Sequence, residues 1–445
     1  MTFKIKFIAF TFYFYSAVAF ASGKRILLDY IKAFEKETKV LGSSLISDKG
    51  EYKLYNISFN SLKWMDGTEL NKPIWHHNIL IIIPKKVDSD TCFYRISNGK
   101  RNEKVPQNIH PVVEHVSLKN NAIGIEIRNV PNQPIKFKDS KQPLKEDAII
   151  AYGWDKYLKS RDMKYIPRLP MLKAAYLGFR VAKNFLKEKN IVINDYVAYG
   201  ESKRGWVVWL LPVVDTAVKA IIPAVIDVLN VQKSMKHHLK IYGNWSPVLK
   251  DYEKFNIPKR MFGKEFASLM ELIDPYKYRR QLKVPKFIIN SGNDQFFLPD
   301  SSQFYFKDLI GENRIMFLPN AGHQFKFSQI QLNSLATYFS LIDDSKAIPE
   351  ISWEKVGETI NIWSNTDISE LRVWQAANAK ARDFRHWDEN SPQYKETKIS
   401  TRANKKKYEI KLYRQKDQMH TSTFIEALFS LQEGNISFTT EAFVN

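Results

Sequence analysis

The pattern of apolar and polar positions first indicates strands. Residues 24–70 are mixed, but the apolar positions of Tyr52–Trp64 alternate with polar ones, as in a half-buried strand. Three further strands are expected, at Ile79–Ile83, Asp90–Ile96 and Ala122–Val130. Pro84 ends the first of these, and a polar turn at Ser97–Gly99 ends the second.

Between residues 144 and 343, helical and strand-like segments alternate. Amphipathic helices are expected at Leu144–Ser160, Leu169–Lys189, Ser202–Val214 and Gln329–Asp343. Strands are expected at Ile193–Gly200, Ala217–Asp227, Val284–Asp294 and Asn313–His323. This spacing predicts an α/β fold with a mainly parallel sheet flanked by helices. The alternation breaks at residues 229–280, where we expect a helical insertion or cap over the sheet.

The pattern changes again at Pro349. From Glu350 onward the segments are short and strand-like, and polar turns divide them. We therefore expect an α/β domain over residues 24–348 and a β-sandwich domain over residues 349–445.

The first residues have the pattern of a secretory signal peptide. Lys4 and Lys6 form a positive region, an apolar run extends from Phe7 to about Tyr15, and Ala19–Ala21 is a small-x-small cleavage site. We predict that residues 1–21 are removed and that the remainder is exported, to the periplasm or the medium. The alternative is an uncleaved anchor, although the apolar run is shorter than the ~20 residues of a membrane-spanning helix. After cleavage no transmembrane segment is expected.

Charge and cysteine content narrow the classes of partner. The formal net charge of +20 favours encounters with anionic surfaces. The lysines are scattered among acidic residues, and Asn404–Tyr408 is the one tight basic cluster, so we expect no nucleic-acid binding. Cys92 is the only cysteine, which excludes an intrachain disulfide. The histidine pairs at 76–77 and 237–238 lack a third ligand at metal spacing, so no metal site is expected.

Three predicted strand ends carry residues that are typical of nucleophilic catalysis. Ser202 stands between a strand and a helix, Asp294 ends the expected strand segment at 284–294, and His323 ends the last one, at 313–323. Parallel strands bring their carboxyl ends to one edge of the sheet, where ligands bind. The chain order Ser, Asp, His is that of α/β-hydrolases, in which the serine lies on a sharp turn. The spacing from Asp294 to His323 leaves room for one helix and one strand.

Each of these residue types has a chemical role in acyl transfer. The Ser202 hydroxyl needs a base to become a nucleophile, and the His323 imidazole titrates in the right range. Asp294 would orient the imidazole and stabilise its charged form. The backbone N–H of Lys203 would stabilise the oxyanion, and a second donor is expected near Asn98. No cofactor is required.

Taken singly, these residues have plainer explanations. Ser202 could be a helix-capping serine, and Asp300 competes with Asp294 for the acidic role. Glu201 is a candidate substrate contact, and its alternative is a position in a solvated turn. Trp245 is a second candidate substrate contact, and its alternative is burial in the core. Arg204 occupies the place of the last glycine in Gly-x-Ser-x-Gly and is expected to bind a carboxylate, either a neighbour's or a substrate's.

Several longer stretches resemble one family. GESKRGW, RLPMLKAA, HHLKIYGNWSPVLKDY, NDQFFLPDSS and LPNAGHQF are similar to segments of the PhoPQ-activated pathogenicity-related proteins, which are exported proteins with an α/β-hydrolase-like core. The resemblance covers roughly residue 50 to the end. It implies Ser202, Asp294 and His323 as triad positions and a C-terminal β-domain that carries Asp383–Arg385.

The sequence leaves two functions open. The first is an exported serine hydrolase that cleaves an ester or amide of a small molecule or peptide through an acyl-enzyme. The second is a secreted binding or signalling protein that keeps the hydrolase core without turnover, because the resemblance extends to eukaryotic secreted growth regulators. The geometry of Ser202 and His323 separates the two, since catalysis requires their side chains within or near hydrogen-bond reach.

Overall fold

The computed structural model describes residues 23–402, 404–412 and 420–445. The predicted signal peptide at residues 1–21 lies outside this part, so its cleavage stays a prediction.

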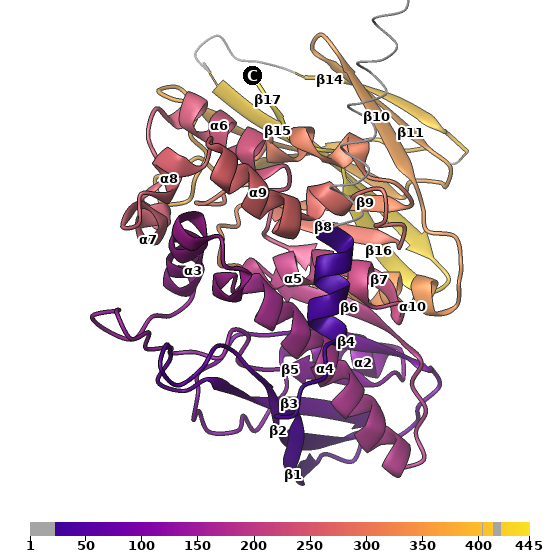
Figure 1. Cartoon of the computed structure of the whole chain (residues 1–445). Helices are drawn as coiled ribbons and strands as arrows, with labels where there is room; N and C mark the ends of the chain where they lie inside the picture. Colours follow the sequence, from indigo (N-terminus) through magenta and orange to yellow (C-terminus); the bar gives the residue numbers. More distant parts are fainter. Residues whose placement is uncertain (1–22, 403, 413–419) are drawn as a thin grey trace, which may run out of the picture.

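A nine-stranded sheet forms the centre of the α/β part (Figure 1). Its strands are β1 (Lys39–Asp48), β2 (Tyr52–Lys63), β3 (Ile74–Pro84), β4 (Thr91–Ile96), β5 (Gly124–Ile127), β6 (Asp195–Glu201), β7 (Val218–Ala224), β8 (Lys286–Ser291) and β9 (Asn313–Leu318). They lie in the order β1-β2-β3-β5-β4-β6-β7-β8-β9. Pairing is antiparallel from β1 to β5 and parallel from β5 to β9. The fold is therefore α/β-hydrolase-like, as predicted.

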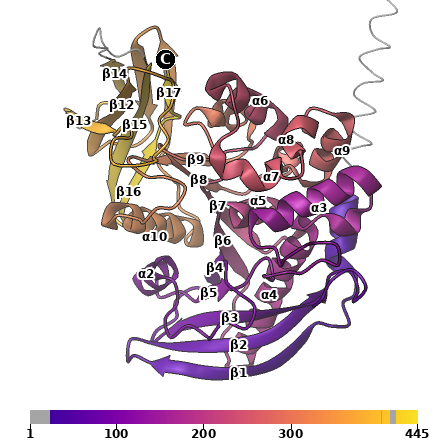
Figure 2. The ribbon, with the colours of Figure 1, turned by 90° about the vertical axis from the view of Figure 1, so that its left-hand side faces the viewer.

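Helices cover both faces of this sheet (Figure 2). Helices α2 (Pro111–Lys119) and α10 (Gln329–Asp343) lie on one face, and α4 (Arg168–Glu188) and α5 (Lys203–Val214) lie on the other. Two large apolar clusters fill the space between the sheet and its helices. Among the described residues, no helix is long and apolar enough to cross a membrane.

Strand β1 and helix α2 were not predicted from the sequence. Strand β1 is exposed along most of its length and pairs with β2 mainly through its backbone, so it lacks a hydrophobic pattern. Helix α2 is short, but it buries Val112, Val113 and Val116, and its first turn is capped by His110 ahead of Pro111. That proline and the apolar spacing are a helix signal that the strand-like surroundings conceal.

The segment between β7 and β8 is helical. It contains α6 (Val231–Tyr242), α7 (Lys250–Glu253), α8 (Ile257–Arg260) and α9 (Lys264–Ile273). Of these, α7, α8 and α9 lie beside α3 (Asp147–Ser160) (Figure 1). The spacing from Asp294 to His323 leaves room for one helix, but no α-helix forms between them. The chain there forms two 3-10 turns, at Ser301–Phe304 and Phe306–Asp308, before it enters β9.

The C-terminal part consists of two antiparallel sheets. One has the order β10 (Ile351–Val356), β11 (Thr359–Ser364), β14 (Lys407–Lys411). The other has the order β13 (Lys395–Ile399), β12 (Glu370–Asn378), β15 (His420–Leu431), β16 (Gly434–Thr439), and β17 (Phe443–Val444) pairs with β15.

Strand β16 joins the C-terminal sheets to the central sheet. The N–H of Phe317 in β9 donates to Thr439 Oγ1 at 3.0 Å, and the N–H of Ser437 donates to Ser334 Oγ in α10 at 3.0 Å. One apolar cluster runs without a break from Phe287 in the central sheet to Phe438 in β16. The two parts are thus packed through a shared core.

This shared core predicts that a chain ending at residue 348 does not fold as a stable unit. Truncation exposes the apolar surface of β9 and α10 that β16 covers, which favours aggregation. Near-ultraviolet circular dichroism and a thermal melt check this, and we expect the sharp transition of the full chain to be lost. A soluble truncated chain with a cooperative transition near that of the full chain would contradict it.

Candidate active site

Ser202 lies on a strained turn between β6 and α5. Its backbone has φ 54° and ψ −123°, a region that residues other than glycine rarely adopt. Its N–H donates to the carbonyl of Ala224 at 2.8 Å, which fixes the turn against β7. Ser202 is the N-cap residue of α5, yet its side chain makes no capping hydrogen bond. The capping alternative is therefore wrong, and the hydroxyl is free for another partner.

Gly205 lets helix α5 approach the strands closely. A Cβ atom at this position would lie 2.8 Å from the carbonyl oxygen of Gly200 and 3.1 Å from that of Ala224. Real Cβ atoms do not approach backbone atoms this closely without a shift. The glycine that follows Arg204 thus serves the close packing usually served by the last glycine of the Gly-x-Ser-x-Gly turn.

Ser202, His323 and Asp294 form one hydrogen-bonded row. Nε2 of His323 lies 2.9 Å from Ser202 Oγ. Nδ1 of the same ring lies 2.9 Å and 3.1 Å from the two carboxylate oxygens of Asp294. Asp294 is buried and also accepts the N–H of Phe296 at 2.7 Å. The ring of Phe296 packs on the imidazole, with 4.3 Å between the ring centroids.

Two more strained residues surround this row. Glu146, at the N-terminus of α3, has φ 48° and ψ −124°, nearly the backbone conformation of Ser202. Val225, directly after β7, has φ 45°, which is rare for a β-branched residue. Both line the same cavity as Ser202. Strain of this kind persists where the surrounding structure imposes it, and it gathers at functional sites.

The basic residues that follow the nucleophile are held by Glu146. NH1 and NH2 of Arg204 each donate to one oxygen of Glu146 at 2.7 Å, and Nε donates to the carbonyl of Val130 at 2.6 Å. Lys203 Nζ lies 2.9 Å from Glu146 and 3.4 Å from Asp147. Burial alone would raise the pKa of Glu146, but Arg204 and Lys203 outweigh it and hold that pKa well below its ordinary value. Of the two carboxylates considered for Arg204, it binds the neighbour's. Arg204 also lines the cavity beside Ser202, so its predicted substrate contact stays a prediction.

Glu201 is held in a similar way. Its two carboxylate oxygens each accept NH2 of Arg95 at 3.1 Å. NH1 of Arg95 donates to the buried Glu126 at 2.8 Å. Glu201 still lines the cavity beside Ser202, so its predicted substrate contact remains a prediction.

Other candidates lie away from the row. Trp245 stacks on the ring of His238 and is absent from the walls of the cavities beside Ser202, which corrects its predicted role. Asp300 is 3.0 Å from His237 Nε2 and also pairs with Arg382, so it does not replace Asp294. In the part of the chain that the structure describes, no group of three His, Cys, Asp or Glu side chains could hold a metal ion.

Two cavities meet at Ser202. One of about 930 Å³ has mixed polar walls and includes Asn98, Glu201 and His323. The other, of about 70 Å³, is enclosed mainly by apolar side chains from the segment between β7 and β8. Ser202, Lys203, Asp147 and Phe296 line both. Asn98 thus lines the same large cavity as Ser202, and its predicted role as the second oxyanion donor stays a prediction.

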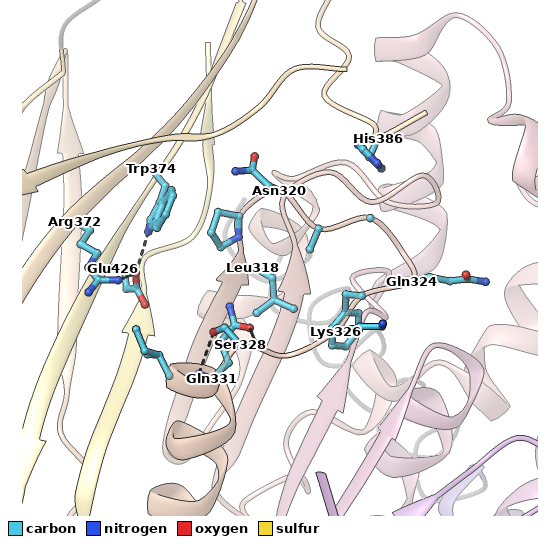
Figure 3. Close-up of a pocket in the computed structure, with 15 residues that line it drawn as sticks. Leu318, Asn320, Gln324, Lys326, Ser328, Gln331, Arg372, Trp374, His386 and Glu426 are labelled. Atoms are coloured by element: carbon cyan, nitrogen blue, oxygen red, sulfur yellow. Dashed lines mark hydrogen bonds and ion pairs between the residues drawn. The ribbon is translucent and has the colours of Figure 1, made fainter. Parts of the chain in front are cut away.

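A third cavity of about 740 Å³ adjoins the loop that carries His323 (Figure 3). Figure 3 shows Arg372, Trp374 and Glu426 of the C-terminal sheet facing Leu318 and Gln331 across it. Trp374 Nε1 donates to Glu426 at 2.9 Å. Three residues of the histidine loop, Gln324, Phe325 and Lys326, line both this cavity and the large one beside Ser202.

A loop of the C-terminal part holds the segment around Asp294. The side-chain amide of Asn293 donates to the carbonyl of Phe384 at 2.6 Å, and the backbone carbonyl of Asn293 accepts the N–H of His386 at 2.9 Å. Gln295 donates to the carbonyl of His386 and accepts the N–H of His323 at 2.8 Å. Gln295, like Glu146, escaped the sequence analysis because its partner is distant in the chain and carries no motif.

Substitution of Gly205 tests the close packing. We expect Gly205→Ala to push α5 away from the strands and to displace Ser202 from His323. The thermal midpoint should fall, and reaction of Ser202 with a fluorophosphonate should slow by at least about tenfold, since overpacking of this kind costs ~1–3 kcal/mol. An alanine variant with unchanged midpoint and labelling rate would contradict it.

Substitution of Glu146 tests the charge pairing. Glu146→Gln leaves Arg204 and Lys203 without their main partner. We expect a loss of about 2 kcal/mol in urea unfolding, less than for a fully buried pair because the Glu146 side chain is 36% exposed. Because the folded-state pKa lies below the unfolded value of ~4.3, the difference from wild type should be constant near neutral pH and shrink below about pH 4. A difference that grows on acidification would contradict the assignment.

Known proteins share this sequence and fold to different extents. The autocrine proliferation repressor protein A of Dictyostelium discoideum is 32% identical over 349 residues, which are 74% of this chain and 70% of that protein. The acetyl xylan esterase from Paenibacillus sp. R4 has a TM-score of 0.47 at 12% identity, over 68% of this chain and 88% of its own. Acetyl xylan esterase 1 from Thermoanaerobacterium sp. JW/SL YS485 has a TM-score of 0.49 at 13% identity. The match covers 74% of this chain and 94% of the esterase chain.

Structural similarities of this size carry no information on the reaction. The family pattern described as PhoPQ-activated pathogenicity-related protein matches residues 27–385, which is most of the chain. The Dictyostelium protein covers a similar share of the chain at 32% identity. The chain belongs to the PhoPQ-activated pathogenicity-related protein family.

Proposed function

We propose that this protein is an exported serine hydrolase that cleaves an ester or amide bond through an acyl-enzyme. The observation that carries the proposal is the 2.9 Å contact from Ser202 Oγ to His323 Nε2, made by a serine that caps no helix. Contact at this distance is what a nucleophile and its base require. Asp294 fixes the ring from the other side.

Acylation begins when Ser202 Oγ attacks the substrate carbonyl carbon. The hydroxyl proton passes to His323 Nε2, a C–O bond forms, and the carbonyl electrons move onto the oxygen. That oxyanion lies at the N-terminus of α5, where the N–H of Lys203 has no partner within the helix. Asn98 is the proposed second donor. When the oxyanion collapses, the bond to the leaving group breaks and His323 returns its proton to the departing alcohol or amine.

Deacylation repeats these steps with water. His323 takes a proton from a water molecule, whose oxygen attacks the acyl carbon. The second oxyanion collapses, the bond to Oγ breaks, and Ser202 regains its proton from His323. The products are a carboxylic acid and an alcohol or amine. Asp294 stabilises the imidazolium in both halves without accepting a proton itself.

Two further parts belong to this proposal. Residues 229–280 act as a cap, since their side chains, including Met235, Leu249 and Met261, line the small cavity beside Ser202. Export to the periplasm or the medium is supported by the basic, apolar and small-x-small pattern of residues 1–21.

A secreted signalling protein without turnover is the second candidate. The name of the Dictyostelium relative, autocrine proliferation repressor protein A, favours it. The open cavity and the hydrogen-bonded row at Ser202 favour the enzyme, because a protein that does not catalyse a reaction requires neither feature.

Labelling with a fluorophosphonate tests the proposal. We expect purified mature protein to be labelled on Ser202, as mapped by peptide mass spectrometry. Labelling should be absent in Ser202→Ala and reduced by ~10³-fold or more in His323→Ala, because the base is gone. Ser268→Ala, which changes an exposed serine of α9, serves as the matched control and should label like wild type. If the folded wild-type protein is not labelled, the enzyme proposal is contradicted and the signalling candidate is favoured.

A further inference from the structure

The small cavity beside Ser202 contains an arginine without a carboxylate partner. Arg168, the first residue of α4, is 2% exposed and lines this cavity. Its guanidinium lies over the indole of Trp206, 4.7 Å from the ring centroid. NH1 reaches the carbonyl of Lys203 at 3.4 Å and the sulfur of Met171 at 3.6 Å. Nε is buried and has no hydrogen-bond partner.

Burial of this charge is costly for the fold. Among the residues that the structure describes, no carboxylate lies within ion-pair distance of Arg168, although other buried arginines have one. Burial lowers the pKa of Arg168 to about 10, so the side chain stays charged at neutral pH. It also stands at the positive end of the α4 dipole. A buried, unpaired cation in a native protein calls for an explanation, and a missing anionic ligand is one.

The neighbouring charges do not neutralise it. Glu146 is bound to Arg204 and Lys203, and Asp147 lies 3.4 Å from Lys203. The hydroxyl of Tyr252 donates to the other oxygen of Asp147. Of the charged residues that line the small cavity, Arg168 and Lys203 are cations and Asp147 is the one carboxylate. Lys203 is paired with Asp147, so Arg168 is the cation in excess.

The position of His323 indicates which part of a substrate lies here. His323 must protonate the leaving group, and it lines the large cavity but not the small one. The leaving group therefore occupies the large cavity, and the acyl group occupies the small one. The small cavity has a volume of about 70 Å³. A cavity that binds benzene has a volume of ~150 Å³, roughly twice as large. The small cavity therefore suits a short acyl chain.

We propose that the acyl group carries a terminal carboxylate that binds Arg168, so that the substrates are esters or amides of short dicarboxylic acids. This inference rests on the proposed hydrolase function. The planar guanidinium matches the two oxygens of a carboxylate and forms strong charge-assisted hydrogen bonds in a dry site. Apolar walls, among them Val231, Met235 and Met261, suit the methylene groups between the carboxylate and the scissile carbonyl.

Two fluorogenic esters of the same alcohol test the inference. One is 4-methylumbelliferyl hydrogen succinate, and the other is its neutral methyl ester, each corrected for hydrolysis without enzyme. We expect wild-type kcat/KM to be higher for the anionic ester. In Arg168→Met the ratio of the two kcat/KM values should fall by roughly 30-fold or more, the range for loss of one partner of a buried charge pair. Arg161→Met, which changes the exposed arginine at the C-terminal end of α3, is the matched control and should keep the wild-type ratio.

A binding measurement separates this inference from the proposed function. Succinate should raise the thermal midpoint of wild type and of Ser202→Ala by a few degrees, and leave that of Arg168→Met unchanged. Fluorophosphonate labelling of Ser202 with no preference for the anionic ester and no succinate effect would overturn the inference and leave the hydrolase standing. Equal loss on both esters in Arg168→Met would also overturn it, since it indicates a role at the reaction centre. Succinate binding without labelling or turnover would overturn the hydrolase while retaining an anion site.

Discussion

The strained backbone of Ser202 is the constraint on which the rest of the site depends. A φ of 54° costs a serine of the order of 1–3 kcal/mol, and the surrounding structure must supply that energy. It does so through the bond from Ser202 N–H to Ala224, the close approach of α5 at Gly205, and the large apolar clusters on both faces of the sheet. In return the hydroxyl points away from its helix and toward His323.

Ion pairs anchor the helix that follows the nucleophile, and side-chain packing separates the small cavity from the large one. Glu146 holds Lys203 and Arg204, the two residues after Ser202, so the first turn of α5 is anchored to the N-terminus of α3. The helices after β7 close the small apolar cavity, while the histidine loop borders the large one. Gln295 ties that loop to His386, so the loop between β12 and β13 helps to position His323.

The sequence predicted those features that depend on local pattern. Ser202, Asp294 and His323 were found because parallel strands end at one edge of the sheet, which strand positions alone determine. Arg204 was recognised as a carboxylate ligand, but its partner Glu146 was not, because 58 residues separate them and pairing at that range depends on the tertiary fold. Arg168 was missed for the same reason, since an unpaired charge is visible only when every neighbour is known. Helix α2 carried a signal in His110 and Pro111 that strand-like surroundings concealed.

Trapping of the acyl-enzyme would show whether the strained turn presents Ser202 as a working nucleophile. Rapid acid quench of the protein during turnover of a 4-nitrophenyl ester, followed by intact-protein and peptide mass spectrometry, detects a covalent acyl group. We expect one acyl group per chain, on Ser202, which forms and decays at rates compatible with product release. Product release without any acyl adduct, or an adduct on another residue, would contradict it.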